Sequence, residues 1–272
     1  MNWIWRALAA LTAAVEVVLL GWLWFGPALA VRDVHVVGSR HMSSEQITRA
    51  AGLSGDASII SIDGTSSQQR LLNQVWIRSA VVQPQLPDTV VIQVREWDPV
   101  AAYHAGVSTK LFLLSSQAIV LGATGNAGGL VEVQGPAGAD PRVGDRALDP
   151  QLLTAMVNIR RGLPVLIGQD VSRFVVDSCG NLTLVAKRGW KVYFGRVLTP
   201  EEFASLSAKL TALKAITSQV NFNSVDLEYV NLMNPVEPAV GYKSLEPPAP
   251  TPAPGATPPP SPSPSPFSNP CK

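Results

Sequence analysis

The stretch WIRSAVVQPQLPDTVVIQVREWDPVA, residues 76–101, contains two β-rich runs on either side of a proline-bounded turn. The runs cover residues 76–83 and 89–97, and the segment Pro84–Asp88 separates them. Two β-rich runs joined by a short turn-forming segment are typical of a β-hairpin. The stretch therefore predicts two adjacent antiparallel strands.

The residues before this hairpin predict one strand and two helices. Asp33–Gly38 alternates apolar and polar residues, which indicates a short strand and turn. Ser43 and Gln46 have capping-box spacing and open a helix, and Thr65–Gln68 forms a second capping box. Ser58–Ile62 predicts a short extended piece between the helices. The order strand, helix, helix, strand, strand predicts an α+β unit with both helices on one face of the sheet.

The residues after Ala102 predict a second, mixed β-sheet domain with flanking helices. Asp149 and Pro150 are typical of a helix start, as are Thr199 and Glu202. A length of about 140 residues is sufficient to bury a core. The expected strands are 110–114, 118–121, 130–133, 171–176, 182–186, 190–194, 225–229 and 236–242, with helices over 149–161 and from 199 onward.

The N-terminus predicts a single transmembrane helix. Ala7–Phe25 is apolar apart from Glu16 and spans about 28 Å as a helix, close to the hydrocarbon thickness of a bilayer. Tryptophans near both ends suit the membrane–water boundaries. Arg6 lies on the amino side, so residues 1–6 are expected in the cytoplasm, residues 7–26 in lipid, and the rest outside.

A cleavable signal peptide is the alternative reading of the same segment. Ala28-Leu29-Ala30 has the form of a cleavage site, although the apolar stretch is longer than the 7–15 residues usual for a signal peptide. Both interpretations predict that the remainder of the chain lies outside the cytoplasm. Glu16 is costly in lipid, and either pairs with another helix or is tolerated in a hydrophobic anchor.

The overall composition excludes several classes of function. The chain of 272 residues has 21 Lys and Arg against 20 Asp and Glu, and this balance gives no basic surplus for nucleic acid binding. Two cysteines and three histidines show no metal-ligand spacing. The motifs G-x-S-x-G, S-x-x-K with K-T-G, H-E-x-x-H and the phosphate loop G-x-x-x-x-G-K-[ST] are all missing. We therefore expect no catalytic site, metal, cofactor or nucleic acid partner. A disulfide between Cys179 and Cys271 is possible outside the cytoplasm.

The last 29 residues differ from the rest. Twelve of the 23 prolines lie in residues 244–272, where Ser-Pro and Pro-Pro repeats predict polyproline II or disordered chain. The expected organisation is a cytoplasmic N-terminus over 1–6, a transmembrane helix over 7–26, a first domain over 31–102, a second over 103–243 and a tail over 244–272.

The first domain resembles a POTRA (polypeptide-transport-associated) domain, and together with the membrane anchor it resembles the FtsQ/DivIB family of bacterial cell-division proteins. Trp97 departs from this pattern, because the family often has arginine after the glutamate. The matching residues are Val34, Val36, Gly38, Ser43, Glu45, Ile47, Trp76, Ile77, Ala80, Val82, Pro87, Thr89, Val90, Ile92, Val94, Glu96, Pro99, Val100 and Ala101.

The resemblance continues through the second domain, over 180–184, 189–195, 209–213, 225–229 and 239–242. It implies partners, namely FtsB/DivIC-like and FtsL-like coiled-coil division proteins and other divisome membrane proteins. It also implies where the first of these binds, because the family accepts an FtsB/DivIC-like segment along the edge of its last strand. Here Glu228 replaces an arginine of the family, which suggests a partner with a different charge pattern. The matching partner-binding positions are Tyr229, Val240, Gly241 and Tyr242.

The function that the resemblance implies is a non-enzymatic scaffold of the divisome, which links membrane division proteins and supports septal cell-wall synthesis. Its expected location is the plasma (inner) membrane at the division septum, with most of the chain extracytoplasmic. A POTRA module of protein transport or outer-membrane assembly is the alternative. Such a module normally precedes a closed β-barrel, for which the second domain lacks regular amphipathic strands of about ten residues.

Overall fold

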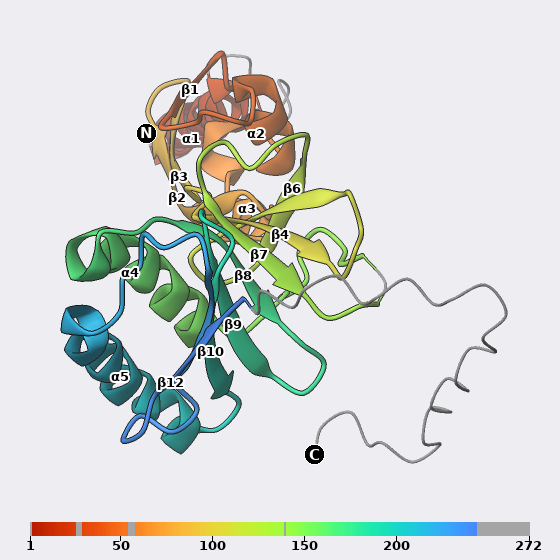
Figure 1. Ribbon diagram of the computed structural model, residues 1–272. Coiled ribbons are helices and arrows are strands. Elements are labelled where there is room, and N and C mark those ends of the chain that lie inside the picture. Colours follow the sequence, from red (N-terminus) through yellow and green to blue (C-terminus); the bar gives the residue numbers. More distant parts are fainter. Residues whose placement is uncertain (1, 26–28, 54–57, 139, 244–272) are drawn as a thin grey trace, which may run out of the picture. The chain divides into compact units, whose positions relative to one another are not determined.

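The computed structural model describes residues 2–25, 29–53, 58–138 and 140–243 (Figure 1). The chain divides into two compact units, Met1–Asp98 and Pro99–Lys272. The sequence places the boundary after Ala102, and in the structure the residues from Ala101 onward belong to a strand of the second unit. The proline-rich tail over 244–272, which includes Cys271, lies outside the described residues.

The first element is helix α1, Asn2–Phe25. Several of its apolar side chains, including those of Leu11, Val17 and Val18, are exposed. Across the described residues, no helix combines the length and apolarity that a membrane crossing requires. The expected span over residues 7–26 therefore stays a prediction.

The remainder of the first unit has the order strand, helix, helix, strand, strand, which confirms the sequence prediction. The elements are β1 Asp33–Val37, α2 Ser44–Ala50, the short 3₁₀ helix η2 Ile59–Ser61, α3 Gly64–Leu72, β2 Ile77–Gln85 and β3 Thr89–Glu96. The three strands form one sheet in the order β1-β3-β2. β1 runs parallel to β3, and β2 runs antiparallel to it.

The core of the first unit lies between the two helices and one face of this sheet. Ile47 of α2, Leu71 of α3 and Ile92 of β3 are each completely buried. A short amphipathic helix buries few side chains, so these contacts with the sheet, rather than helix propensity, stabilise α2 and α3.

Three local predictions for this unit were wrong. Residues 59–61 form a 3₁₀ helix instead of an extended piece. The N-cap of α3 is Asp63, whose carboxylate accepts a hydrogen bond from the Thr65 amide, so the helix begins before the expected capping box. Pro84 lies within β2, where a missing N–H is tolerated because β2 is an edge strand.

The loop between β1 and α2 is held by a buried carboxylate. Glu96 at the end of β3 accepts hydrogen bonds from the backbone N–H groups of His41 and Met42, at 2.8 and 3.2 Å. Burial alone would raise the pKa of Glu96, but these hydrogen bonds hold it below its ordinary value. The His41 ring stacks on half-buried Trp76 with centroids 4.2 Å apart. Gly38 has a φ of +94° and lies so close to the Val94 carbonyl that no side chain fits.

The second unit contains a nine-stranded mixed sheet in the order β12-β11-β10-β9-β8-β7-β4-β5-β6. Its strands are β4 Ala101–Ala105, β5 Leu111–Leu114, β6 Val120–Thr124, β7 Val131–Gly135, β8 Val171–Val176, β9 Asn181–Ala186, β10 Lys191–Arg196, β11 Leu227–Asn231 and β12 Ala239–Tyr242. Its helices are α4 Pro150–Ile167, α5 Pro200–Ala215 and the short 3₁₀ helix η3 Ile216–Ser218. The mixed α+β class is thus confirmed.

Helices α4 and α5 cover the same face of this sheet (Figure 1). α4 connects the parallel neighbours β7 and β8, and α5 connects the parallel neighbours β10 and β11. The antiparallel meander β8-β9-β10 leaves β10 pointing the same way as β8, so both connections move across the sheet in the same direction. Because such connections are right-handed, both helices must pack on one face.

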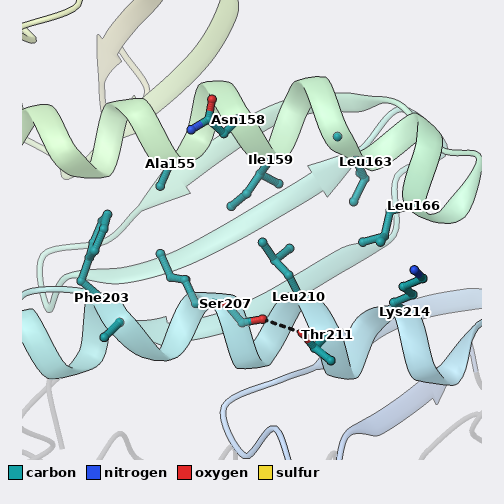
Figure 2. Close-up of a pocket in the computed structure, with 13 residues that line it drawn as sticks. Ala155, Asn158, Ile159, Leu163, Leu166, Phe203, Ser207, Leu210, Thr211 and Lys214 are labelled. Atoms are coloured by element: carbon teal, nitrogen blue, oxygen red, sulfur yellow. Dashed lines mark hydrogen bonds between the residues drawn. The ribbon is translucent and has the colours of Figure 1, made fainter.

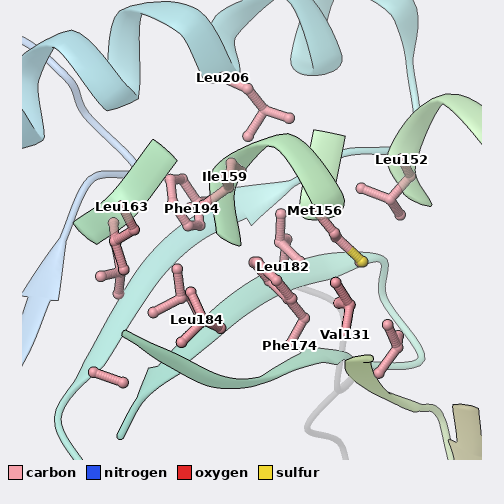
Figure 3. Packing of buried hydrophobic residues seen from close by; sticks show 14 of the residues in the cluster. Val131, Leu152, Met156, Ile159, Leu163, Phe174, Leu182, Leu184, Phe194 and Leu206 are labelled. Carbon is pink, nitrogen blue, oxygen red and sulfur yellow. The ribbon is translucent and has the colours of Figure 1, made fainter. Parts of the chain in front are cut away.

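The main core fills the space between these helices and the sheet (Figure 3). Met156 of α4, Phe174 of β8 and Phe194 of β10 are completely buried there. Asp149 caps α4 as expected, but the helix continues to Ile167 instead of ending at Arg161. It continues through Pro164 and ends at Gly168, which adopts the left-handed conformation with a φ of 68°.

Cys179 lies in the turn between β8 and β9. Its backbone N–H donates a hydrogen bond of 2.9 Å to Asp177, and the residue is buried. Cys179 is disulfide-bonded. Asp177 also accepts from the Asn181 backbone N–H, which fixes the turn.

Candidate partner-binding edge

Strand β12 is the last strand at one end of the nine-stranded sheet. Its inner side pairs antiparallel with β11, with Tyr229 opposite Gly241 and Val230 opposite Val240. In the described part of the chain, no further strand pairs with its outer side. This outer side, which we call the β12 edge, offers unpaired backbone groups to an incoming strand.

The register identifies which backbone groups face outward. The N–H of Lys243 donates a hydrogen bond of 2.7 Å to the carbonyl of Asp226, so Lys243 points toward β11. The backbone groups of successive residues alternate between the two sides of a strand. The N–H and C=O groups of Val240 and Tyr242 are therefore directed away from β11 and toward the β12 edge.

The four expected partner-binding residues lie together on β11 and β12 but differ in their surroundings. Val240 is half-buried and packs against the main core. The Tyr229 ring lies over Gly241, where an added Cβ would come within 2.2 Å of a ring carbon. Tyr229 also packs against Tyr193 of β10, with ring centroids 5.7 Å apart. The Tyr229 ring therefore already packs against residues of its own sheet.

Tyr242 and three further apolar residues are exposed around the β12 edge. Tyr242 is 50% exposed, and Val236 in the preceding turn is 85% exposed. Met233 and Val225 are also exposed. Met233, Val225 and Val236 were not among the predicted site residues. The sequence places Val225 and Val236 in strands over 225–229 and 236–242, but β11 begins at Leu227 and β12 at Ala239, so both valines lie outside the strands.

The buried side chain of Lys209 is hydrogen-bonded to β10, the strand that pairs with β11. β10 contains a bulge between Tyr193 and Gly195, and Lys209 of α5 donates from Nζ to the Phe194 carbonyl at 2.6 Å. Lys209 is only 6% exposed, and burial lowers its pKa below the ordinary value. The contact joins α5 to β10, the strand on which β11 and β12 are built.

A shallow groove of about 610 Å³ lies between α4 and α5 (Figure 2). Ile159 and Leu163 line it from α4, and Phe203 and Leu210 line it from α5. Lys214 at one end is the charged residue among the side chains that line it. A groove whose lining lacks an acid–base pair offers no general acid–base chemistry.

A second hollow, of about 570 Å³, lies in the first unit beside β2 and β3. It is lined by Arg40, Arg78 and Arg95 together with Glu96 and Asp98. Arg40 pairs with Asp98 at 3.0 Å, and the guanidinium of Arg78 lies over the Trp97 ring. Within the described ranges, no group of three or more His, Cys, Asp or Glu side chains could hold a metal ion.

The first unit defines the class of protein. Residues 29–97 match the family model described as POTRA domain, FtsQ-type. The match begins just before β1 and ends just after β3, so it covers the whole three-stranded sheet and its two helices. The chain is therefore a POTRA-domain protein, in which a mixed-sheet unit with an exposed terminal strand follows the POTRA domain.

Similarity to characterised cell-division proteins extends beyond this domain. The chain is 22% identical to cell division protein FtsQ of Corynebacterium glutamicum over 194 residues, which cover 70% of the chain and 84% of that protein. It is 25% identical to FtsQ of Allochromatium vinosum over 215 residues, 78% of the chain and 80% of that protein. Cell division protein DivIB of Geobacillus kaustophilus is 33% identical over 97 residues, 35% of the chain and 37% of that protein. Together with the FtsQ-type POTRA match, these similarities support the FtsQ/DivIB family for this chain.

Proposed function

We propose that the chain is a non-enzymatic scaffold of the bacterial divisome, which links membrane division proteins and supports septal cell-wall synthesis. The similarity to proteins named FtsQ and DivIB supports a role in cell division. The single observation that carries the scaffold role is the unpaired β12 edge at the end of the second unit.

The proposed partner at this edge is an FtsB/DivIC-like protein, and an FtsL-like protein is proposed as a further partner of the chain. Its extracytoplasmic segment adds an extended strand beside β12. In strand addition, backbone hydrogen bonds supply affinity and side chains select the register. Val240 and Tyr242 supply the backbone groups, and the exposed Tyr242 ring supplies an apolar anchor.

We further propose that residues 7–26 anchor the chain as a single membrane-spanning helix, with the N-terminus in the cytoplasm. A helix of 24 residues, the length of α1, extends about 36 Å and is long enough for the bilayer core. The arginine at position 6 sets the orientation by the positive-inside rule. A reporter that is active only outside the cytoplasm, fused after Lys272, should be active. Cytoplasmic activity would contradict the proposal.

The partner site is tested with the full chain in detergent, titrated with the extracytoplasmic segment of the FtsB/DivIC-like protein from the same cell. Tyr242→Ala should weaken binding by about 2 kcal/mol or more if Tyr242 is an anchor. Val240→Pro should weaken binding further, because it removes an outward N–H. Val165→Ala, at an exposed position on α4, is the matched control and should leave binding unchanged.

Folding must be measured in the same samples, because proline in a strand can unfold the second unit. Circular dichroism and thermal melting identify such a loss. If Tyr242→Ala melts like the wild type and binds with the wild-type affinity, Tyr242 is not the anchor. If Val240→Pro also melts and binds like the wild type, the partner does not bind along β12.

Depletion of the protein in cells separates the scaffold role from outer-membrane transport. Filamentous cells with unconstricted septa are expected when a division scaffold is lost. A loss of outer-membrane proteins with normal septa would instead favour a transport or assembly module.

A further inference from the structure

The charges around the β12 edge are predominantly negative. The segment 225–243 contains Asp226, Glu228 and Glu237 against Lys243, a net charge of −2, whereas the whole chain carries +1. All four of these residues are exposed. The acidic side chains thus give this edge a sign opposite to that of the chain as a whole.

The three acidic residues lie at both ends of β12. Glu237 precedes the strand by two residues. Glu228 falls at the irregularity of β11, where Leu227 pairs with Tyr242 and Tyr229 with Gly241, so Glu228 lies beside Tyr242. Acidic side chains therefore flank the outward backbone groups at both ends.

Among the described residues, the nearby lysines form no ion pair with these carboxylates. Lys243 directs its Nζ to the Val225 carbonyl at 2.9 Å. Lys191 is the cross-strand neighbour of Tyr229 and lies on β10, which is one strand further from the β12 edge than β11. None of the ion pairs within the described residues includes Asp226, Glu228 or Glu237. The acidic groups remain available to a cation on an incoming segment.

The apolar residues of the same surface follow the alternation of the strand. Val240 and Tyr242 share one face of β12, because successive side chains point to opposite faces. Ala239 and Gly241 lie on the other face, where the Tyr229 ring covers Gly241. An added strand would therefore place every second side chain next to the apolar pair.

We propose that the protein segment added at the β12 edge carries more lysine and arginine than aspartate and glutamate, with apolar side chains at alternate positions. This inference rests on the proposed function, because it takes β12 as the partner-binding strand. Complementary charges across an interface steer association and suppress wrong partners. Each exposed pair contributes about two- to fivefold in affinity, and salt weakens it.

The experiment starts by identifying the segment. A photo-crosslinking amino acid replaces exposed Ala239 in the full chain, and cross-linking is carried out in cells that normally contain the protein. The linked peptide is sequenced, synthesised and titrated against the full chain in detergent. We expect a surplus of lysine and arginine in this peptide and an affinity that falls as salt rises.

Charge variants then test the role of the carboxylates. Glu228→Lys combined with Glu237→Lys should weaken binding of the synthetic peptide about fivefold or more. The affinity of the Glu228→Gln and Glu237→Gln double variant should lie between that of the Lys double variant and that of the wild type. Asp145→Lys is the control and should change the affinity less than twofold, because Asp145 lies beside β6 at the opposite end of the sheet.

Each outcome decides between the two proposals. A neutral or acidic linked peptide, or unchanged or tighter binding by the Lys variants, would overturn the charge inference and leave the β12 edge as the partner site. The absence of any protein cross-link from position 239, in cells where the variant supports division, would overturn the edge interface itself. The expected charge surplus with graded loss of affinity supports both.

Discussion

Replacing Glu96 with glutamine should destabilise the first unit by removing the acceptor that holds the β1–α2 loop. The Glu96 side chain is only 3% exposed. One carboxylate oxygen lies 2.8 Å from both the backbone N and Nδ1 of His41, and the other lies 3.2 Å from the Met42 N. Glutamine keeps one acceptor and turns an NH₂ group toward a donor. Hydrogen bonds to charged groups contribute about 1.5–3 kcal/mol, so we expect Glu96→Gln to lower the free energy of unfolding by about 2 kcal/mol.

The pH dependence of this difference provides a specific signature. The pKa of Glu96 is lowered in the folded protein from its ordinary 4.5. A carboxyl whose pKa is depressed by folding stabilises the folded state above its unfolded pKa, and this stabilisation is lost as pH falls through the folded pKa. Glutamine does not titrate. The stability gap between wild type and Glu96→Gln should therefore be largest at neutral pH and shrink in acid.

Hydrogen exchange of the full chain, followed by mass spectrometry, measures this effect in the first unit alone. Peptides that cover the β1–α2 loop and α2 should exchange faster in Glu96→Gln at neutral pH. The melting temperature of a domain of this size should fall by about 8–16 °C for 2 kcal/mol. Glu45→Gln, at an exposed position in α2, is the matched control. Unchanged exchange in the Glu96 variant, or a gap that persists in acid, would refute the role of the carboxylate.

Three further changes test other parts of the second unit. Gly241→Ala places a new Cβ 2.2 Å from the Tyr229 ring, so the ring must move. We expect the free energy of unfolding, measured by chemical denaturation, to fall by about 1–3 kcal/mol. An unchanged denaturation midpoint would show that the ring shifts freely. Lys209→Met removes an ammonium group whose pKa is lowered by burial. The wild type should therefore gain stability over the variant as pH rises from the folded pKa of Lys209 toward 10.5. Parallel curves of stability against pH for the two proteins would contradict this. Cys179 should resist alkylation in denaturant until a reductant is added, and labelling without reductant would contradict its disulfide.

Local side-chain chemistry explains why parts of the fold could be predicted from the sequence. The capping boxes at Ser43 and Thr199 are both formed, because each needs only residues three positions apart. The hairpin of β2 and β3 is also local. The N-cap of α3 was missed because Asp63 and Thr65 offer competing starts two residues apart, and contacts of the helix with the sheet decide between them.

The candidate site was predictable only in part. Tyr229, Val240, Gly241 and Tyr242 could be placed on the last two strands from their resemblance to a known family pattern. That the Tyr229 ring covers Gly241, and that Val240 packs on the core, follows from cross-strand pairing and is not encoded in the spacing. The sequence places Val236 in the last strand, and its exposure in the turn before β12 follows only from where the strand actually begins.

The helix starts at Ser43, Asp149 and Thr199, the hairpin of β2 and β3 and the element order of the first unit could be predicted from the sequence, because they depend on hydrogen bonds and periodicity within a few residues. The position of β12 at the end of the sheet, and the identity of its outward backbone groups, follow from the strand order of the folded chain. Strand order depends on pairing between distant segments, such as β7 with β4 and β10 with β11. Right-handed crossovers then placed both helices on one face and left the β12 edge uncovered in the described part of the chain.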